Sequence, residues 1–221
     1  MKVVCFIISG ALQTRKPTLL STLNIPNIHK IAECGCTTIL KMREFKTNDS
    51  KAVQEFSQLV DHFQDEILQN LYENMLILCD DQTIFEYSNR YTNRCKIVKR
   101  EIDLIFQELT NCFNHSKIIF VHFCLDPKES LIIVDQLIVK LNDIYIAILC
   151  SFEEVDSKIS QQEKWKPIQS YQIKNGKFVK NIREDYPMIA ICYHERITRC
   201  DDNTKFTEES CLKNAGNGTI L

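Results

Sequence analysis

The chain has 221 residues, of which 44% are hydrophobic and 25% charged, and its formal net charge is −2. These values are typical of an ordinary globular protein that can bury a substantial core. The charge argues against nucleic-acid binding, because that function needs a clustered basic face. No apolar run approaches the length of a membrane span, so we expect neither nucleic acid nor a membrane as a partner.

Short apolar runs alternate with amphipathic segments along the first 151 residues. Four near-continuous runs predict buried parallel strands: Lys2–Ser9, Met75–Cys79, Lys117–Leu125 and Ile144–Ser151. The predicted fold is α/β, a three-layer sandwich with a mostly parallel sheet. The first run could be taken for a signal peptide, but it is rich in β-branched residues and only Lys2 precedes it as a positive charge. We therefore favour a strand there.

Helix signals lie between these runs. Asn24 precedes an apolar helical face that ends at Gly35, and Cys36–Met42 is a further strand candidate. Asn48 or Asp49 is expected to cap a long helix whose apolar stripe runs from Val53 to Leu71 with a 3.6-residue period. A capping box, Asp126-Pro127-Lys128-Glu129, predicts the start of another helix.

The composition becomes more polar after Ser151. We expect residues 1–151 to form the α/β core and residues 152–221 to complete the same domain as a polar linker, a hairpin, a last strand and a tail. The turn Asn175-Gly176 predicts a two-residue β-hairpin at the periphery. Pro187–Tyr193 is the last predicted strand. From Cys200 the tail is polar and rich in glycine and asparagine, and we expect its end to be poorly ordered.

The 11 cysteines are odd in number and spread through predicted strands and helices, which argues against a disulfide scaffold. Cys34-Gly35-Cys36 is spaced too tightly for a zinc knuckle. Thiols on neighbouring strands are expected to meet only by accident of register. We expect reduced thiols and a place in the cytoplasm or nucleus. The cysteines expected to be buried are Cys5, Cys79, Cys124, Cys150 and Cys192.

Several motifs together resemble the alkaline phosphatase superfamily, which includes cofactor-independent phosphoglycerate mutases, sulfatases and phosphodiesterases. An apolar strand, VVCFIISG at residues 3–10, is followed by IPNIHKIAECGCTT at residues 25–38, which matches the superfamily's order of strand, Pro-Asn helix and glycine. KIIFVHFCLDP, ESLIIVDQLIVKL and IYIAILCS resemble its later strand, helix and strand. The resemblance covers about residues 1–151.

The departures from this pattern concern the residues that would bind metal. Ser9 stands where the resemblance implies a metal-binding aspartate, and Phe152-Glu153-Glu154 replaces an expected Asp-His pair. The segment from Leu125 to Leu131 is too short for an Asp-x-x-x-His ligand set. A two-metal site needs several carboxylates and imidazoles around two ions. The resemblance therefore implies a shortened, degenerate member that has lost this catalysis.

Carboxylates at predicted strand ends could still form a reduced site for Mg²⁺, Mn²⁺ or Zn²⁺, because functional residues of open α/β sheets follow the strands. The candidate metal ligands are Asp80, Asp81, Asp126 and Glu153. The candidate catalytic residues are Thr37, Thr38, His122 and His194. Each has a structural alternative: Asp81 as a helix cap, the threonines as strand residues, His122 as a core histidine and His194 as a solvated strand end.

Two functions remain open at this stage. The favoured one is a non-catalytic alkaline phosphatase-like protein that acts as a binding or scaffold module for a protein partner. The alternative is a metal-dependent phosphohydrolase or phosphomutase with a reduced site. Convergence of the candidate carboxylates with His122 or His194 in one cleft would favour the enzyme. Nucleotide enzymes are disfavoured, because the glycine-rich phosphate-binding motifs are absent from the sequence.

Overall fold

The computed structural model describes residues 1–13, 17–43, 49–60, 75–90, 92–152, 173–174, 177–178, 182–196, 198, 203–214 and 219–220. Its strands are β1 (Lys2–Leu12), β2 (Cys36–Arg43), β3 (Met75–Cys79), β4 (Cys95–Ile97), β5 (Ile118–Phe123), β6 (Ile144–Phe152), β7 (Ile173–Lys174), β8 (Lys177–Phe178), β9 (Ile182–Tyr193) and β10 (Thr219–Ile220). Its helices are α1 (Leu19–Thr22), α2 (Pro26–Cys34), α3 (Lys51–Leu59), α5 (Gln82–Ser88), α6 (Ile102–Cys112), α7 (Pro127–Ile138) and α8 (Glu208–Asn214).

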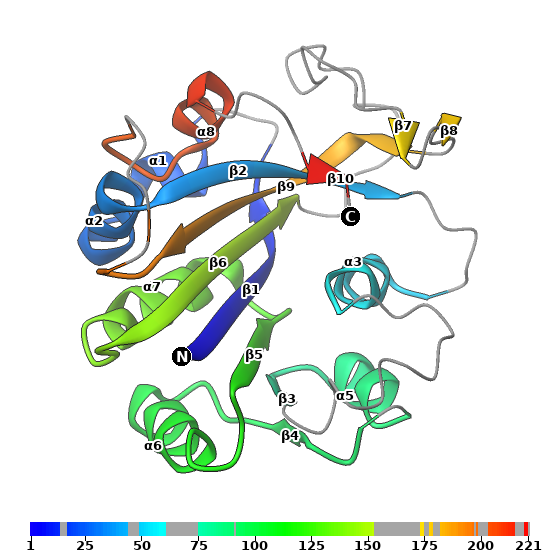
Figure 1. Ribbon diagram of the computed structural model, residues 1–221, viewed down its shortest axis with the longest axis vertical. Coiled ribbons are helices and arrows are strands. Elements are labelled where there is room, and N and C mark those ends of the chain that lie inside the picture. The colour runs from blue at the N-terminus through cyan, green and yellow to red at the C-terminus, as the bar shows by residue number, and fades with distance from the viewer. Residues whose placement is uncertain are drawn as a thin grey trace.

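Eight of the described strands form one mixed sheet in the order β10-β2-β9-β6-β1-β5-β3-β4 (Figure 1). The four strands predicted from apolar runs are neighbours at its centre, and all are parallel. Strand β9 runs antiparallel to both β6 and β2. The α/β fold with a mostly parallel sheet is thus confirmed, and the first apolar run is the central strand β1.

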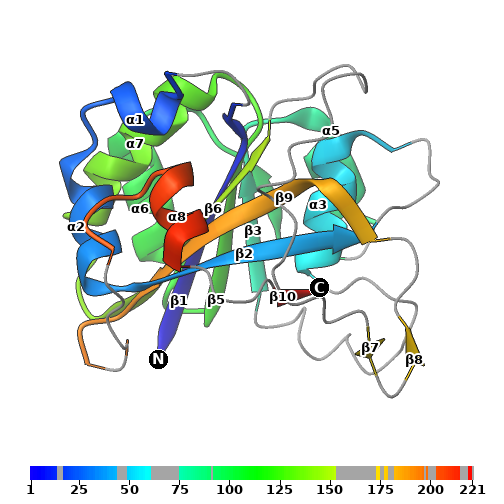
Figure 2. The ribbon, with the colours of Figure 1, turned by 90° about the horizontal axis from the view of Figure 1, so that it is seen from above.

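Helices cover both faces of the sheet, which gives the predicted three layers (Figures 1 and 2). On one face, α1, α2, α6, α7 and α8 pack on the core that contains Phe6 and Phe123. On the other face, α3 and α5 pack on a smaller core that contains Ile7 and Ile77. Continuous apolar strands follow from this arrangement, because each central strand buries both of its faces.

Pro26 and Asn27 both stabilise the start of α2. Pro26 occupies the first turn, where its missing amide proton costs nothing. The carboxylate of Asp135 on α7 accepts hydrogen bonds from the backbone amides of Asn27 and Ile28, both at 2.9 Å, and from the Asn27 side chain. A buried carboxylate from a neighbouring helix therefore caps α2 and fixes the packing of the two helices.

Several predicted boundaries are wrong. Helix α3 is capped by Ser50, whose hydroxyl accepts from the Val53 amide, and not by Asn48 or Asp49. The tail after Cys200 contributes the helix α8 and a short strand, β10, that pairs with β2, so Pro187–Tyr193 is not the last strand. Strand β4 was not predicted, and α5 entered the sequence analysis only through Asp81 as a possible helix cap, because each element is too short to show a periodic apolar pattern.

The predicted hairpin at the periphery is confirmed. Strands β7 and β8 pair as an antiparallel hairpin in a separate two-stranded sheet, at the margin of the molecule in Figure 1.

Residues 61–74, on which the predicted stripe of the long helix continues, lie outside the described residues. Among the helices that are described, none is long and apolar enough to cross a membrane.

Candidate functional site

Three small polar side chains meet at the carboxyl end of the central strands. Ile8 of β1 pairs in register with Phe123 of β5 and Cys150 of β6, so the next residues along each chain, Ser9, Cys124 and Ser151, come side by side. These three residues line a pocket of about 310 Å³, together with Lys51 and Glu55 from α3. This is the edge of the sheet at which open α/β proteins place their ligands.

Gly10 also lines this pocket. Its φ of 76° lies in the left-handed region that glycine adopts at no steric cost. The register of β1 against β6 shifts between Ile8 and Leu12, where the chain passes through Gly10. The Gly10 amide then donates a hydrogen bond of 3.4 Å to the hydroxyl of Ser151.

His122 on β5 contacts this row of side chains through Ser9. Its Nε2 shares a hydrogen bond of 2.9 Å with the hydroxyl of Ser9, and its ring lies 5.3 Å from that of Phe56. The side chain is fully buried, and Nδ1 has no hydrogen-bond partner among the described residues. Burial lowers the pKa of His122 to about 3, so the ring is neutral at physiological pH.

A serine beside a histidine is also the arrangement of a nucleophile and its base, so the pair must be tested against that chemistry. A general base works best with a pKa near the operating pH, and a third group normally orients it through its other nitrogen. His122 has neither property, because its pKa is far below neutrality and its Nδ1 faces no described partner. The hydrogen bond between Ser9 and His122 thus fits the structural alternative, in which His122 is a core histidine.

Helix α3 brings one pair of opposite charges to the pocket. Glu55 is almost fully buried, with 1% of its side chain exposed, and its Oε1 lies 3.9 Å from the Lys51 ammonium. Lys51 also donates a hydrogen bond to the carbonyl oxygen of Phe152. The two charges offset each other, so the pocket presents no net charge from this helix.

Asp80 is engaged by an arginine. Its Oδ1 accepts a hydrogen bond of 2.7 Å from the Cys124 amide, and its Oδ2 lies 3.6 Å from Nε of Arg100. Burial raises the pKa of Asp80, while the Cys124 amide and the guanidinium oppose that rise. Arg100 also lies 3.2 Å from the Glu129 carboxylate and donates to the hydroxyl of Ser130. Both carboxylates of this cluster therefore already have a protein cation.

Asp81 and Asp126 serve as helix caps. Asp81 Oδ1 accepts from the amides of Thr83 and Ile84 at the start of α5, at 2.8 and 3.1 Å. Asp126 accepts from the second and third amides of α7 in the same way. A capping aspartate satisfies amides that the helix itself leaves unpaired. Asp81 thus has the structural role that the sequence analysis gave as the alternative to a metal ligand, that of a helix cap.

The other candidates lie elsewhere. Thr37 is buried on β2 and accepts a hydrogen bond from the side chain of Asn203, and Thr38 is paired with Ala190 of β9. His194 follows β9, which runs antiparallel to β6, so it lies at the opposite end of the sheet from His122. Glu153 lies outside the described residues. Within the parts of the chain that are described, no three His, Cys, Asp or Glu residues gather to hold a metal ion.

The pocket contains residues that sequence reasoning did not select. Ser9 and Ser151 were noted as strand ends, but not as neighbours of Cys124, because strand order cannot be read from the sequence. Lys51 and Glu55 carried a signal, since opposite charges four residues apart face each other on a helix.

Burial of Cys5, Cys79 and Cys150 is confirmed, whereas Cys124 and Cys192 are half-buried.

Comparisons with known proteins bear on the fold. Neither a protein-family model nor a curated protein matches the chain. The solved structure of the PH0037 protein from Pyrococcus horikoshii is similar, with a TM-score of 0.58 and 13% sequence identity, over 99% of this chain and 92% of that one. The cofactor-independent phosphoglycerate mutase from Thermoplasma acidophilum DSM 1728 is similar with a TM-score of 0.56 and 8% identity, over 99% of this chain and 96% of that one.

At these identities the similarity concerns the fold alone. The fold is nevertheless the one that the resemblance implied, and the second of these structures is a cofactor-independent phosphoglycerate mutase, a class of protein that the resemblance includes. This chain shares the α/β fold of these two solved structures, which is the fold that the resemblance to the alkaline phosphatase superfamily implies.

Proposed function

We propose that this chain is a non-catalytic protein of the alkaline phosphatase-like fold that works by binding a protein partner, in the cytoplasm or nucleus. The observation that supports this most is the hydrogen bond between Ser9 and His122. Ser9 stands where the resemblance implies an aspartate that binds metal. A hydroxyl held by a neutral, buried imidazole offers no anionic ligand to a divalent cation.

The remaining carboxylates of this edge support the same proposal. Asp80 is bound by Arg100 and by a backbone amide, while Asp81 and Asp126 cap helices. A metal ion would have to compete with each of these contacts and would leave Arg100 buried without its partner. Removing one partner of a buried ion pair is costly, so these carboxylates are poor ligands in the folded chain.

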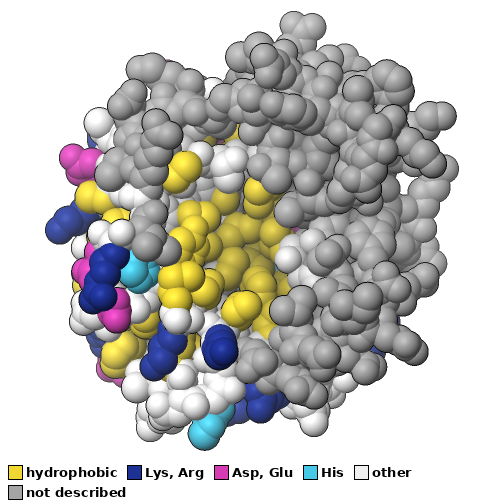
Figure 3. Space-filling model, in the orientation of Figure 1, with side chains coloured by type: hydrophobic (Ala, Val, Ile, Leu, Met, Phe, Trp, Pro, Cys, Tyr) yellow, Lys and Arg dark blue, Asp and Glu magenta, His cyan; other side chains and the backbone are white. Residues whose placement is uncertain are grey.

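An apolar surface supports the binding role. Figure 3 shows hydrophobic side chains gathered in a hollow on the face toward the viewer. On the sheet face that α3 and α5 pack against, Leu40, Phe120 and Cys192 are only partly buried. Exposed apolar area that is contiguous is typical of interaction sites.

A metal and activity screen tests the proposal. We expect no hydrolysis of generic phosphate esters with Mn²⁺, Mg²⁺ or Zn²⁺, and no rise in the thermal unfolding midpoint with any of these ions. An ion that bound the native protein at a concentration 100 times its Kd would stabilise it by about 2.7 kcal/mol, which a thermal scan detects easily.

The alternative, a metal-dependent phosphohydrolase or phosphomutase with a reduced site, predicts the opposite results. Metal-dependent hydrolysis would then be lost in Asp80→Asn, Asp126→Asn and Glu153→Gln. Glu195→Gln is the matched control, since Glu195 is exposed at the other end of the sheet. Activity that follows this pattern would replace the proposal of a non-catalytic protein.

A further inference from the structure

Two cysteines face each other across strands β2 and β9. Cys36 is the first residue of β2 and pairs in register with Cys192 of β9. Directly opposite residues of an antiparallel pair point to the same face, with Cβ atoms about 4.5–5.5 Å apart. Cα atoms of such partners are generally about 4.5–5.5 Å apart, within the range of about 4.4–6.8 Å that disulfides bridge. A disulfide holds its Cβ atoms about 3.5–4.5 Å apart, so a bond between the two sulfurs needs only a small approach of the strands at this position.

Gly35 holds this register. A Cβ atom on Gly35 would lie 2.6 Å from the carbonyl oxygen of Cys192 and 2.6 Å from that of Ile31. Real side chains do not approach backbone this closely, so glycine alone fits. Gly35, the residue between α2 and Cys36, therefore packs directly against the backbone of Cys192. A change in the register of β2 and β9 would break this contact.

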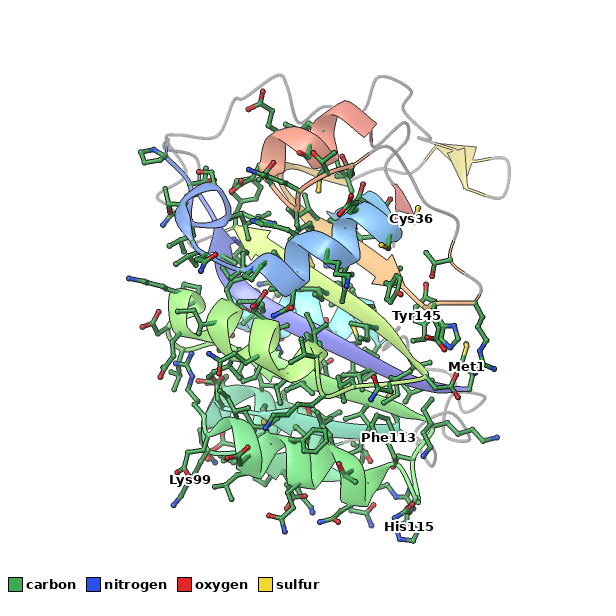
Figure 4. The ribbon with its side chains drawn as sticks, turned by 90° about the vertical axis from the view of Figure 1, so that its left-hand side faces the viewer. Met1, Cys36, Lys99, Phe113, His115 and Tyr145 are labelled. Carbon is green, nitrogen blue, oxygen red and sulfur yellow. The ribbon has the colours of Figure 1, made fainter. Side chains whose placement is uncertain are left out.

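The surroundings of the pair include a third thiol and a phenol. The side chain of Tyr145 on β6 hydrogen-bonds Cys192 and lies close to Cys36 and Cys5. Cys5 of the central strand β1 is buried and lies close to Cys192. Cys36 is exposed and Cys192 half-buried, so a small oxidant in solution reaches Cys36 first. Figure 4 shows Cys36 and Tyr145 at the same margin of the molecule.

A second close pair of cysteines provides a contrast within the chain. The sulfurs of Cys79 and Cys95 are 4.0 Å apart, on the parallel strands β3 and β4. Both side chains are buried, and Cys95 pairs in register with Ile77, two residues before Cys79. Solvent does not reach these sulfurs, and their backbones are out of register, so proximity of sulfurs alone does not favour a disulfide there.

We propose that Cys36 and Cys192 form a reversible disulfide when the protein meets hydrogen peroxide. The Cys36 thiolate attacks one peroxide oxygen and the O–O bond breaks, which gives a sulfenic acid and a hydroxide; the hydroxide takes up the proton that the Cys36 thiol released and becomes water. The Cys192 thiolate then attacks this sulfur and the S–O bond breaks. The leaving hydroxide takes up the proton that the Cys192 thiol released, which gives a second water. The two thiols lose two electrons and two protons in total, and the peroxide is reduced to two waters.

This bond would change the protein in two ways. It would tie β2 to β9 and thereby close a long loop that contains β3 to β6, which restricts the unfolded chain. It would also consume the thiol to which Tyr145 is hydrogen-bonded. We therefore expect the oxidised protein to unfold at a higher urea concentration than the reduced protein, and a thiol reductant to reverse the difference.

Peptide mapping tests the position of the bond. The reduced full-length chain is treated with hydrogen peroxide, remaining thiols are alkylated, and the digest is analysed by mass spectrometry. We expect one linked peptide pair, Cys36 with Cys192, which disappears on reduction. Cys36→Ser and Cys192→Ser should lose this link, while Cys34→Ser, which removes the neighbouring thiol on α2, should keep it.

Urea unfolding of the same samples gives a second measurement. Oxidation should raise the midpoint of the wild type and of Cys34→Ser, and should leave the midpoint of Cys36→Ser unchanged. Circular dichroism of each reduced variant shows whether it is folded, so that a missing link is not mistaken for a misfolded chain. A dominant link through Cys5 or Cys79, or oxidation that stops at sulfinic acid without any link, would overturn the proposal.

Discussion

Two buried histidines at opposite ends of the sheet have very different surroundings. His122, at the carboxyl end of β5, has one hydrogen bond to Ser9 and packs on Phe56, and no described group pairs with Nδ1. His194, beyond β9, accepts a hydrogen bond from the Arg196 amide at Nδ1, and its Nε2 lies 3.8 Å from the carboxylate of Asp143. The same residue type thus has apolar surroundings at one end and polar partners at the other.

The charged groups near each histidine differ in the same sense. Asp80 and Arg100, at the carboxyl end, have side chains only 1% and 15% exposed. Asp143 and Arg196, at the amino end, form an ion pair whose side chains are 64% and 69% exposed. Exposed pairs contribute little to stability, whereas loss of one partner of a buried pair is costly. We therefore expect the charged residues at the carboxyl end of the sheet to matter more for the free energy of unfolding than those at the amino end, because they are buried.

The largest effect is expected for Arg100→Ala. This change leaves the buried carboxylate of Asp80 without its cation and removes the contacts to Glu129 and Ser130. We expect a loss of about 3–5 kcal/mol in the free energy of unfolding at neutral pH, measured by urea denaturation. Arg196→Ala is the matched control and should change stability by no more than about 0.5 kcal/mol.

The pH dependence of this variant provides a further check. Burial raises the pKa of Asp80, and Arg100 opposes the rise, so Arg100→Ala raises that pKa further. A carboxyl group with a raised pKa in the folded state stabilises the protein when protonated and loses that contribution as the pH rises through the folded pKa. The penalty of Arg100→Ala should therefore be smaller in acid than in neutral solution. An equal loss of stability in acid and in neutral solution would show that Arg100 does not affect the pKa of Asp80.

A second prediction concerns His122 and the acid stability of the whole protein. Its pKa is lowered to about 3 by burial, while an unfolded histidine titrates near about 6.5. Between these values the unfolded chain binds a proton that the folded chain does not bind, so stability falls as the pH drops through that window. At about pH 5 the cost is about 2 kcal/mol, since each pH unit is worth about 1.4 kcal/mol.

Urea unfolding between neutral pH and about pH 4 measures this slope. His122→Gln removes the titrating group and should flatten the slope, whatever its effect on stability at neutral pH. His115→Gln is the control, because His115 is exposed on the turn after α6, where Figure 4 labels it. Identical slopes for the wild type and His122→Gln would mean that water or a proton reaches this ring.

Much of the fold could be predicted from the sequence because its signals are local. Met75–Cys79 and Ile144–Phe152 are apolar on both faces, which only a strand between two layers of helices permits. The cap at Asp126 followed by Pro127 is also a local signal, and it marks the start of α7. Strand β4 and helix α8 were missed, because short elements depend on tertiary contacts that leave no periodic pattern.

The site was harder to predict, because its properties arise between segments that are distant in the chain. The sequence indicated that Ser9 replaces an aspartate, but the partner of Ser9 is 113 residues away. Nothing near Asp80 in the sequence identifies Arg100 as its cation, since that contact depends on the pairing of β3 with β4 and on the position of α7. Likewise, Cys36 and Cys192 face each other only through the register of β2 and β9, which no local pattern encodes.

The smallest effect is expected at the amino end of the sheet, for Asp143→Asn. This change removes the charge that faces His194 and Arg196 but keeps the size of the side chain and its tolerance of a positive φ, which is 55° here. Because Asp143 is mostly exposed, we expect a loss of no more than about 0.5 kcal/mol in the free energy of unfolding, and less in high salt. Urea unfolding in low and high salt measures both. A loss of several kcal/mol that salt does not reduce would contradict the comparison, because the amino end would then depend on its charges as much as the carboxyl end does.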